Sequence, residues 1–412
     1  MRHFLLMLAL AAPVAADPLE LYRWFHAHPE LSKKETQTSQ KLAQELKALG
    51  LEVEQGIGGT GLMAILRGQP GGPVVLYRAD MDALPVQEAT GLPYSSQVPG
   101  VMHACGHDLH MACAVAALGE LARKRKQWKG TIVFVGQPAE ELGNGAKGML
   151  LDPRFQQVLH KAGGQPRLAF ALHDNATLPV GQVSLNPGYV SANVDSVDII
   201  VHGLGGHGAH PDTTVDPIVM GSEIVMSLQT IVSRRLKPGA QALVTVGKFA
   251  AGSKHNIIPP KAELALTVRS YDEKTRQRLL SEIRHISQNI AASYHAPKPP
   301  EVLHNEADFT PSLYNNPDWV RRLRPIFVKK LGEQNLIMQP ASMGGEDFSE
   351  FSRRLKIPGV MFSLGAVDPA LVKKGGPLPG LHSDKFAPAA DTAIPLGAEL
   401  VQACLLEALR DR

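Results

Sequence analysis

A cysteine and a histidine two positions apart are the first side chains in this sequence whose types and spacing suggest chemistry. Cys105 and His107 stand in the segment Met102-His103-Ala104-Cys105-Gly106-His107-Asp108, which leads into a helical pattern. In an extended or turning backbone both side chains can face the same point, and a thiolate with an imidazole suits zinc or another borderline transition metal. An ordinary polar turn is the alternative for this segment.

Two adjacent glutamates and a distant histidine extend the candidate site. Glu140 and Glu141 follow the apolar run 131–135, and His173 follows the run 168–172. Past the end of a strand the backbone can turn both carboxylates inward, so that one binds metal and the other takes a proton from water. A solvated acidic turn and a satisfied core histidine are the alternatives.

These residues stand at the ends of predicted strands. Apolar runs at 62–66, 74–77, 131–135 and 168–172 are typical of short strands, and helical spacing covers 21–25, 38–49 and 108–124. Strands that alternate with helices predict an α/β sheet with parallel segments. Ligands bind beyond the carboxyl ends of such strands, which is where Asp80–Asp82, Gln137–Glu141 and His173 stand.

The pattern changes from about residue 185. Predicted strands at 194–201, 242–249 and 262–270 and helices at 217–233 and 273–294 give the order β-α-β-β-α, which resembles a ferredoxin-like split unit. A proline-rich segment at 296–300 closes this unit, and helix and strand patterns then resume. We therefore predict a catalytic domain at 17–184 and 301–412, interrupted by an inserted domain at 185–300.

Four motifs in this order resemble the M20 metallopeptidases. They are Arg78-Ala79-Asp80-Met81-Asp82-Ala83-Leu84-Pro85, His103-Ala104-Cys105-Gly106-His107-Asp108, Gln137-Pro138-Ala139-Glu140-Glu141 and Leu381-His382-Ser383. The resemblance is closest to the amidohydrolase branch, which includes hippurate hydrolases, N-acyl amino acid amidohydrolases and plant auxin-conjugate hydrolases. It implies a mixed-sheet catalytic domain of zinc-exopeptidase type with an inserted α+β lid or dimerisation domain.

The resemblance implies a two-metal site with a general base. The implied ligands are Cys105, His107, Glu141, His173 and His382. Cys105 stands where the thiolate is shared by both ions, which we expect to be Zn, Mn, Ni or Co. Glu140 stands where the family has the base that deprotonates metal-bound water, whose pKa the metal lowers. Asp80 and Asp82 stand where carboxylates orient the ligating residues.

The inserted domain adds residues to the implied site. His207 stands where the family polarises the substrate carbonyl and stabilises the oxyanion, in some members across a dimer. Asn256 and Arg269 match positions that hold the substrate, and a guanidinium suits the free carboxylate of an amino acid. A surface cation is the alternative for Arg269. The insert is also the candidate surface for a homodimer, although its apolar faces could equally be internal.

Two other functions compete with hydrolysis. Gly203–Gly208 and Gly56–Gly61 both match G-x-G-x-x-G, a signature of dinucleotide binding. The first lacks a repeated βαβ unit, and its acidic residue roughly 20 positions on, Glu223, lies inside a predicted helix, which argues against a nucleotide-dependent oxidoreductase. A non-catalytic periplasmic binding protein for a carboxylate-bearing solute is the second alternative, although a binder needs no general base.

Composition excludes further classes. With 42 Lys plus Arg against 39 Asp plus Glu in 412 residues, the net charge of +3 is too balanced for a nucleic-acid binder. A hydrophobic content of 44% supports a sizeable packed interior. Three cysteines are too few for a disulfide scaffold, and with Cys105 on metal we expect Cys113 and Cys404 to be structural.

Residues 1–16 resemble a secretory signal peptide. Arg2 and His3 precede the apolar run 4–12, and Val14-Ala15-Ala16 offers small residues for cleavage. A first helix of the mature domain is the alternative. We expect a secreted protein, in a bacterial periplasm, with no membrane association after cleavage, because we find no other segment of sufficient length and apolarity.

The expected function is hydrolysis of the amide bond of an N-acyl or N-aroyl amino acid, or of a dipeptide. Asp174 and Asn175 after His173, and Asp384 after the final His-Ser, depart from the usual pattern of the branch. These departures leave the ligands intact and leave the acyl group open. Glu346, in the family-like segment Gly345–Phe348, is a candidate for orienting the ligands.

Overall fold

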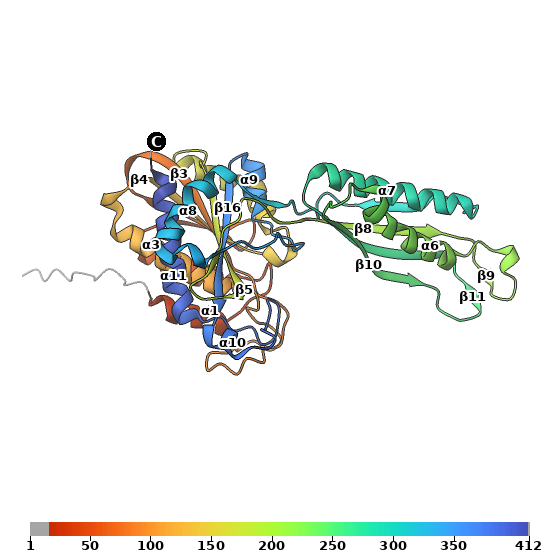
Figure 1. Cartoon of the computed structure of the whole chain (residues 1–412), viewed down its shortest axis with the longest axis horizontal. Coiled ribbons are helices and arrows are strands. Elements are labelled where there is room, and N and C mark those ends of the chain that lie inside the picture. The colour runs from red at the N-terminus through yellow and green to blue at the C-terminus, as the bar shows by residue number, and fades with distance from the viewer. Residues whose placement is uncertain (1–15, 411–412) are drawn as a thin grey trace, which may run out of the picture. The chain divides into compact units, whose positions relative to one another are not determined.

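The computed structural model describes residues 16–410 and divides them into two compact units (Figure 1). Unit 1 holds the described residues of Met1–Pro187, Asn315–Gln339 and Phe351–Arg412, and unit 2 holds Gly188–Tyr314 and Pro340–Glu350. The predicted leader at 1–16 lies outside the described residues, apart from Ala16.

Unit 1 is built on an eight-stranded mixed sheet. In spatial order its strands are β1 (Glu52–Ile57), β2 (Gly61–Arg67), β4 (Lys129–Gln137), β3 (Gln69–Asp80), β5 (Ala169–Pro179), β16 (Gly359–Val367), β6 (Val183–Ser184) and β15 (Leu336–Ile337). β3 runs parallel to β4 and β5, and β16 runs parallel to β5. This confirms the predicted α/β sheet and brings the carboxyl ends of β3, β4 and β5 to the same edge.

Unit 1 also contains helices. They are α1 (Pro18–Ala27), α2 (Thr36–Ala48), α3 (His107–Arg123), α4 (Gly145–Leu151), α5 (Pro153–Ala162), α8 (Pro317–Leu331), α9 (Ser349–Leu355), α10 (Pro369–Lys374) and α11 (Ala390–Leu409). α3 and α11 pack against each other and against the sheet. Val75, Tyr77 and Ala79 alternate along β3 and join the same buried cluster, as the two-residue period of a strand requires.

The α3–α11 contact depends on a glycine. A Cβ atom on Gly397 of α11 would lie 2.8 Å from Sγ of Cys113 on α3 and 2.8 Å from Cδ2 of Leu364 on β16. Non-bonded atoms do not approach this closely without strain. The absence of a side chain at Gly397 therefore lets α11 pack this closely on α3 and β16. Cys105, Cys113 and Cys404 are all free and buried, and the latter two lie in this packed interior.

α11 is also the one described helix that is long and apolar enough to span a membrane. More than half of its most apolar window, 56%, is buried inside the structure. A helix in the core of a folded unit passes the same test of length and composition. The sequence analysis expected no segment after the leader to be long and apolar enough to span a membrane. That expectation is wrong for α11, whose apolar residues pack on α3.

Unit 2 is a two-layer α+β structure. Its antiparallel sheet has the spatial order β10 (Ala242–Ala251), β12 (Lys261–Ser270), β8 (Asn193–His202) and β13 (Glu301–His304). α6 (Pro217–Thr230) and α7 (Glu273–Ser293) lie on one face of this sheet (Figure 1). Ile224, Ile283 and Leu264 are fully buried between the layers, and each stabilises the fold by roughly 1.5–3 kcal/mol.

Short elements complete unit 2. β9 (Gly206–His207) pairs with β11 (Ile257–Ile258), β7 (Gly188–Ser191) pairs with β14 (Leu313–Asn315), and a π-helical turn (Ile231–Arg235) follows α6. The predicted single helix at 217–233 therefore ends in a wider turn.

The second unit also extends further along the chain than predicted. The predicted insert ends at 300, but β13 pairs with β8, with Leu303 opposite Asp198. The segment Pro340–Glu350 joins unit 2 as well, because the Ser342 amide donates to the Val190 carbonyl at 2.8 Å. A four-residue edge strand has too few alternations to be recognised from sequence.

Candidate metal centre

The end of β3 provides two buried aspartates. Asp80 is fully buried, with Oδ2 2.6 Å from Nη1 of Arg78 and Oδ1 2.6 Å from Nδ1 of His110. Burial raises the pKa of Asp80, but the Arg78 guanidinium and the imidazoles of His107 and His110 outweigh it and hold the pKa well below its usual value. Asp80 therefore stays ionised in the interior.

The turn before α3 carries the predicted cysteine and histidine. Gly106 adopts φ +75°, a left-handed conformation that glycine adopts without strain. Nδ1 of His107 donates to the main-chain carbonyl of Asp82 at 2.9 Å, which leaves Nε2 as the ring nitrogen with a free lone pair. Burial raises the pKa of the Cys105 thiol, but His107 and further histidines lower it well below its usual value. The site therefore favours a thiolate.

The end of β4 turns both predicted glutamates inward. Ala139 adopts φ +51° and ψ 42°, which costs a non-glycine residue roughly 1–2 kcal/mol. Three hydrogen bonds hold this turn. Oε1 of Glu35 accepts from the Ala139 amide at 2.8 Å, and the two oxygens of Asp82 accept from the amides of Glu140 and Glu141 at 3.0 Å each. Asp82 thus orients the predicted base and a predicted ligand together.

The two glutamate side chains lie near the same imidazole nitrogen. Oε2 of Glu140 and Oε1 of Glu141 are each 4.0 Å from Nε2 of His107. Burial, and then the negative Cys105, raise the pKa of Glu141 to about 7. A nearby cation would stabilise the ionised form of a carboxylate in these surroundings.

His173 and His382 reach the same place from other segments. His173 lies in β5, with Nε2 3.8 Å from Sγ of Cys105. His382 lies in the loop before α11 with φ +66°, and its amide donates to the Ala104 carbonyl at 2.7 Å. Its Nε2 is 3.5 Å from Oε1 of Glu141. The structure thus brings all the predicted ligands together.

Unpartnered atoms at this place fit a metal ion. Among the described atoms, Nε2 of His107 and Oε1 of Glu141 are buried without a hydrogen-bond partner, at a cost of roughly 1–3 kcal/mol each. Ligand atoms of Cys105, His107 and Glu141 lie within 4.8 Å of one another. A divalent cation would satisfy these atoms, and thiolate, imidazole and carboxylate are the donors that zinc-like ions take.

A second cluster overlaps the first. Asp80, His107, His110 and His173 also offer atoms within 4.8 Å of one another. In His110, however, both ring nitrogens already have protein partners, Asp80 at 2.6 Å and the amide of Asp174 at 2.8 Å. His110 is therefore better suited to support the ligands than to be one.

Comparison with known proteins decides the family. Residues 76–407 match the model of peptidase family M20/M25/M40. The chain belongs to this family. The resemblance found in the sequence is thereby confirmed, and the chain is a metal-dependent hydrolase of amide bonds.

The similarity to individual M20 proteins covers most of the chain. It is 35% identical over 348 residues to N-acetylcysteine deacetylase from Bacillus subtilis, which is 84% of this chain and 87% of the relative. It is 37% identical over 384 residues to thermostable carboxypeptidase 1 from Saccharolobus solfataricus, 92% of each chain. The crystal structure of Bacillus subtilis YxeP, described as a dinuclear metal binding peptidase of the M20 family, matches with a TM-score of 0.79 at 30% identity, over 95% of this chain and 97% of that one.

The remaining predicted residues of this M20 chain belong to unit 2. His207 lies in β9 opposite Ile257, and the Gly208 amide donates to the Asn256 carbonyl at 2.9 Å, so His207 and Asn256 share one short ribbon. Both are exposed. Arg269, in β12, is half-buried and donates from Nη1 to the Met343 carbonyl at 3.1 Å.

Glu346 also lies in unit 2. It is buried, and its Oε1 accepts from the Phe348 amide at 2.8 Å. This contact holds the turn around the family-like segment that the sequence singled out.

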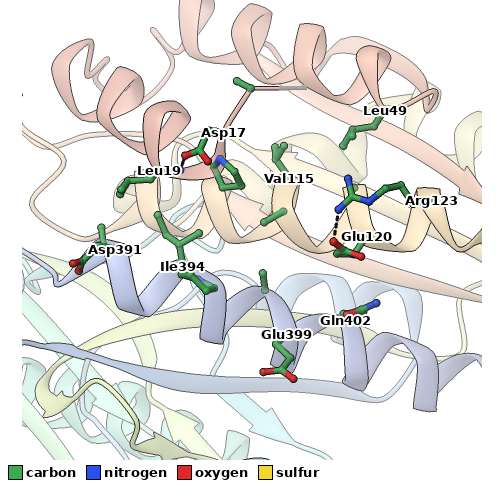
Figure 2. Close-up of a pocket in the computed structure, with 17 residues that line it drawn as sticks. Asp17, Leu19, Leu49, Val115, Glu120, Arg123, Asp391, Ile394, Glu399 and Gln402 are labelled. Carbon is green, nitrogen blue, oxygen red and sulfur yellow. Dashed lines mark hydrogen bonds and ion pairs between the residues drawn. The ribbon is translucent and has the colours of Figure 1, made fainter. Parts of the chain in front are cut away.

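Cavity size does not locate the site of this M20 enzyme. A cavity of about 770 Å³ lies between α1, α3 and α11, and none of the predicted ligands lines it. Figure 2 shows its apolar side chains, such as Val115 and Ile394, beside the ion pair of Arg123 with Glu120. The site is identified by its donor atoms instead.

Two supporting residues were missed in the sequence. Glu35 is fully buried and reaches Ala139 across 104 positions, and nothing local to either residue indicates this contact. His110 follows His107 by three positions on the same helix. That spacing places both rings on one helix face, and it was the signal available for finding His110.

Proposed function

We propose that this chain hydrolyses the amide bond of N-acyl or N-aroyl amino acids, or of dipeptides, with two divalent ions. Cys105, His107, Glu141, His173 and His382 would hold the ions, which we propose to be Zn, Mn, Ni or Co. The observation that carries the proposal is the left-handed turn at Ala139. It brings the carboxylates of Glu140 and Glu141 within 4.0 Å of Nε2 of His107, near the buried thiol of Cys105.

The chain's own residues divide the chemistry. Bound divalent ions supply Lewis acidity, which lowers the pKa of water and polarises a carbonyl oxygen. Glu140 is the proposed general base. Its Oε2 takes a proton from the attacking water and gives it to the leaving amine, a transfer worth roughly 100-fold or more in rate. Asp82 keeps this side chain in place through the Glu140 amide.

Residues of unit 2 are proposed to bind the substrate. The imidazole of His207 would polarise the amide carbonyl, with Asn256 beside it on the same ribbon. Arg269 uses Nε and Nη1 in protein contacts, which leaves Nη2 for the free carboxylate of an amino acid. The names of the relatives, a deacetylase of N-acetylcysteine and a carboxypeptidase, support substrates of this kind.

We also propose export and a homodimer. The leader at 1–16 supports secretion to a bacterial periplasm. Ile218, Val219 and Met226 on α6 and Phe249 on β10 are exposed, Met226 by 71%, and clustered exposed apolar residues mark interaction surfaces. Sedimentation of the purified protein at several concentrations tests the dimer, and a Met226→Glu variant that sediments like the parent would count against this face.

Metal removal and one substitution test the reaction. Chelator-treated protein should not hydrolyse N-acetyl amino acids, and Mn, Co, Ni or Zn should restore hydrolysis. Glu140→Gln should keep its metal, measured by elemental analysis, and lose at least ~100-fold in kcat. The matched control is Glu120→Gln, a partly exposed glutamate on α3, which should behave as the parent. Normal hydrolysis by Glu140→Gln would refute the assigned base.

A further inference from the structure

Asp174 is a fully buried carboxylate directly after the proposed ligand His173. Its side chain is 2% exposed or less, and its Oδ2 has no hydrogen-bond partner among the described atoms. An unpartnered buried oxygen costs roughly 1–3 kcal/mol. A charged group retained at that cost calls for a role beyond packing.

Asp174 lies against the ring nitrogen of His173 that faces away from the site. Nδ1 of His173 is 2.8 Å from the main-chain oxygen of Asp174 and 3.2 Å from its Oδ1. Both partners are acceptors, so the proton of the neutral ring resides on Nδ1. Nε2, which is 3.8 Å from Sγ of Cys105, then carries the lone pair toward the site.

Asp174 is itself held by a chain of buried contacts. Its main-chain amide donates to Nε2 of His110 at 2.8 Å, and its Oδ1 lies 3.2 Å from the same nitrogen. Nδ1 of His110 is 2.6 Å from Oδ1 of Asp80, whose Oδ2 accepts from Arg78 at 2.6 Å. His173 on β5 is thereby connected to the end of β3, through side chains that are all fully buried or nearly so.

Asp174 also fits closely beneath the turn that carries the other ligands. A Cβ atom on Gly106 would lie 2.6 Å from Cγ of Asp174 and 2.7 Å from both of its oxygens. The missing side chain at Gly106 therefore makes the space for this carboxylate. Gly106 lies between Cys105 and His107, so the same carboxylate abuts both the turn and His173.

We propose that Asp174 is a positioning residue of the metal centre, which fixes the ring of His173. This inference rests on the proposed two-metal function. Outer hydrogen-bond partners of this kind set the tautomer and orientation of a ligating histidine, and their loss typically weakens metal binding roughly 10–100-fold. The ion that His173 helps to hold is therefore the one that depends on Asp174.

The test is a Zn²⁺ titration of chelator-stripped protein against a competing chromophoric chelator. Asp174→Asn keeps the size of the side chain and removes its charge. We expect one of the two Zn²⁺ sites to weaken roughly 10–100-fold and the other to change far less. Asp318→Asn is the matched control, because Asp318 is an exposed aspartate of unit 1, and it should match the parent at both sites.

Metal-free melting temperatures separate positioning from a structural role. If Asp174→Asn binds both ions as the parent does, or loses both equally with a matching drop in melting temperature, the inference is wrong. Should Asp174→Asn fail to fold, His110→Gln decides, because it removes the ring nitrogen that accepts from the Asp174 amide and should weaken the same single site. A parent that binds none of Zn²⁺, Mn²⁺, Ni²⁺ and Co²⁺ would instead refute the proposed function.

Discussion

Removal of Glu35 tests whether the turn at Ala139 sets the activity of the site. Oε1 of Glu35 accepts from the amides of Ala139 and Lys33 at 2.8 and 2.9 Å, and Oε2 accepts from Thr60 at 2.5 Å. Glu35→Ala leaves the buried Ala139 amide without its partner. The turn then loses the contact that offsets its left-handed conformation.

The size of the effect follows from that lost contact. A buried donor left unsatisfied costs roughly 1–3 kcal/mol, and the turn can avoid this cost by moving away from the site. If the displaced turn raises the activation free energy by this amount, kcat falls roughly 10–100-fold, since about 1.4 kcal/mol corresponds to tenfold. Glu35→Gln keeps an acceptor for the Ala139 amide and should lose less than Glu35→Ala.

Steady-state hydrolysis of an N-acetyl amino acid at saturating metal measures this loss. Glu45→Ala is the matched control, because Glu45 is a buried glutamate on α2 that bonds Lys41 and the Ala16 amide instead of the turn. We expect it to lower stability to urea and leave kcat unchanged. A Glu35→Ala enzyme with kcat within twofold of the parent would refute the reasoning. The reasoning would also be refuted if Glu35→Ala and Glu45→Ala had the same kcat.

Two further predictions concern stability. Burial lowers the pKa of His26, but hydrogen bonds to Asp108 and Glu88 outweigh it and raise the pKa to about 9. The stabilisation, on the order of 3 kcal/mol, is complete below about pH 6.5 and is lost as pH rises through 9. Urea unfolding at pH 6 to 10 should show this loss in the parent and not in His26→Gln. An unfolding free energy that changes equally with pH in both proteins would contradict the prediction. Gly397→Ala should lower the free energy of unfolding by roughly 1–3 kcal/mol, because the added methyl group overpacks against Cys113. An unchanged urea midpoint would contradict this, since α11 would then move aside without a cost in stability.

Several of the proposed metal ligands could be found from the sequence because they stand at the ends of predicted helices or strands. Cys105 and His107 precede a long helical pattern, and Glu140 and Glu141 directly follow an apolar run, so local periodicity put the first pair at a helix start and the second at a strand end. His382 follows no strand, and its position was implied only by the family resemblance. The structure places it through the amide contact with Ala104.

The supporting residues were not predictable, because each acts across a long separation. The contact of Glu35 with Ala139 spans 104 positions, and that of His110 with Asp174 spans 64. Asp174 was visible only as a departure from the usual pattern. Its buried contacts depend on the parallel pairing of β5 with β3 and on the left-handed Gly106, neither of which leaves a local signal.

The placement of β16 has a consequence for biosynthesis. β16 pairs with β5 on one side and β6 on the other, yet it is translated after all of Gly188–Tyr314. Until residue 367 has left the ribosome, β5 and β6 have unpaired edges, which are prone to pairing with other chains. His382 emerges later still, so a nascent chain acquires the fifth proposed ligand only near the end of translation. Metal loading is therefore expected to follow synthesis.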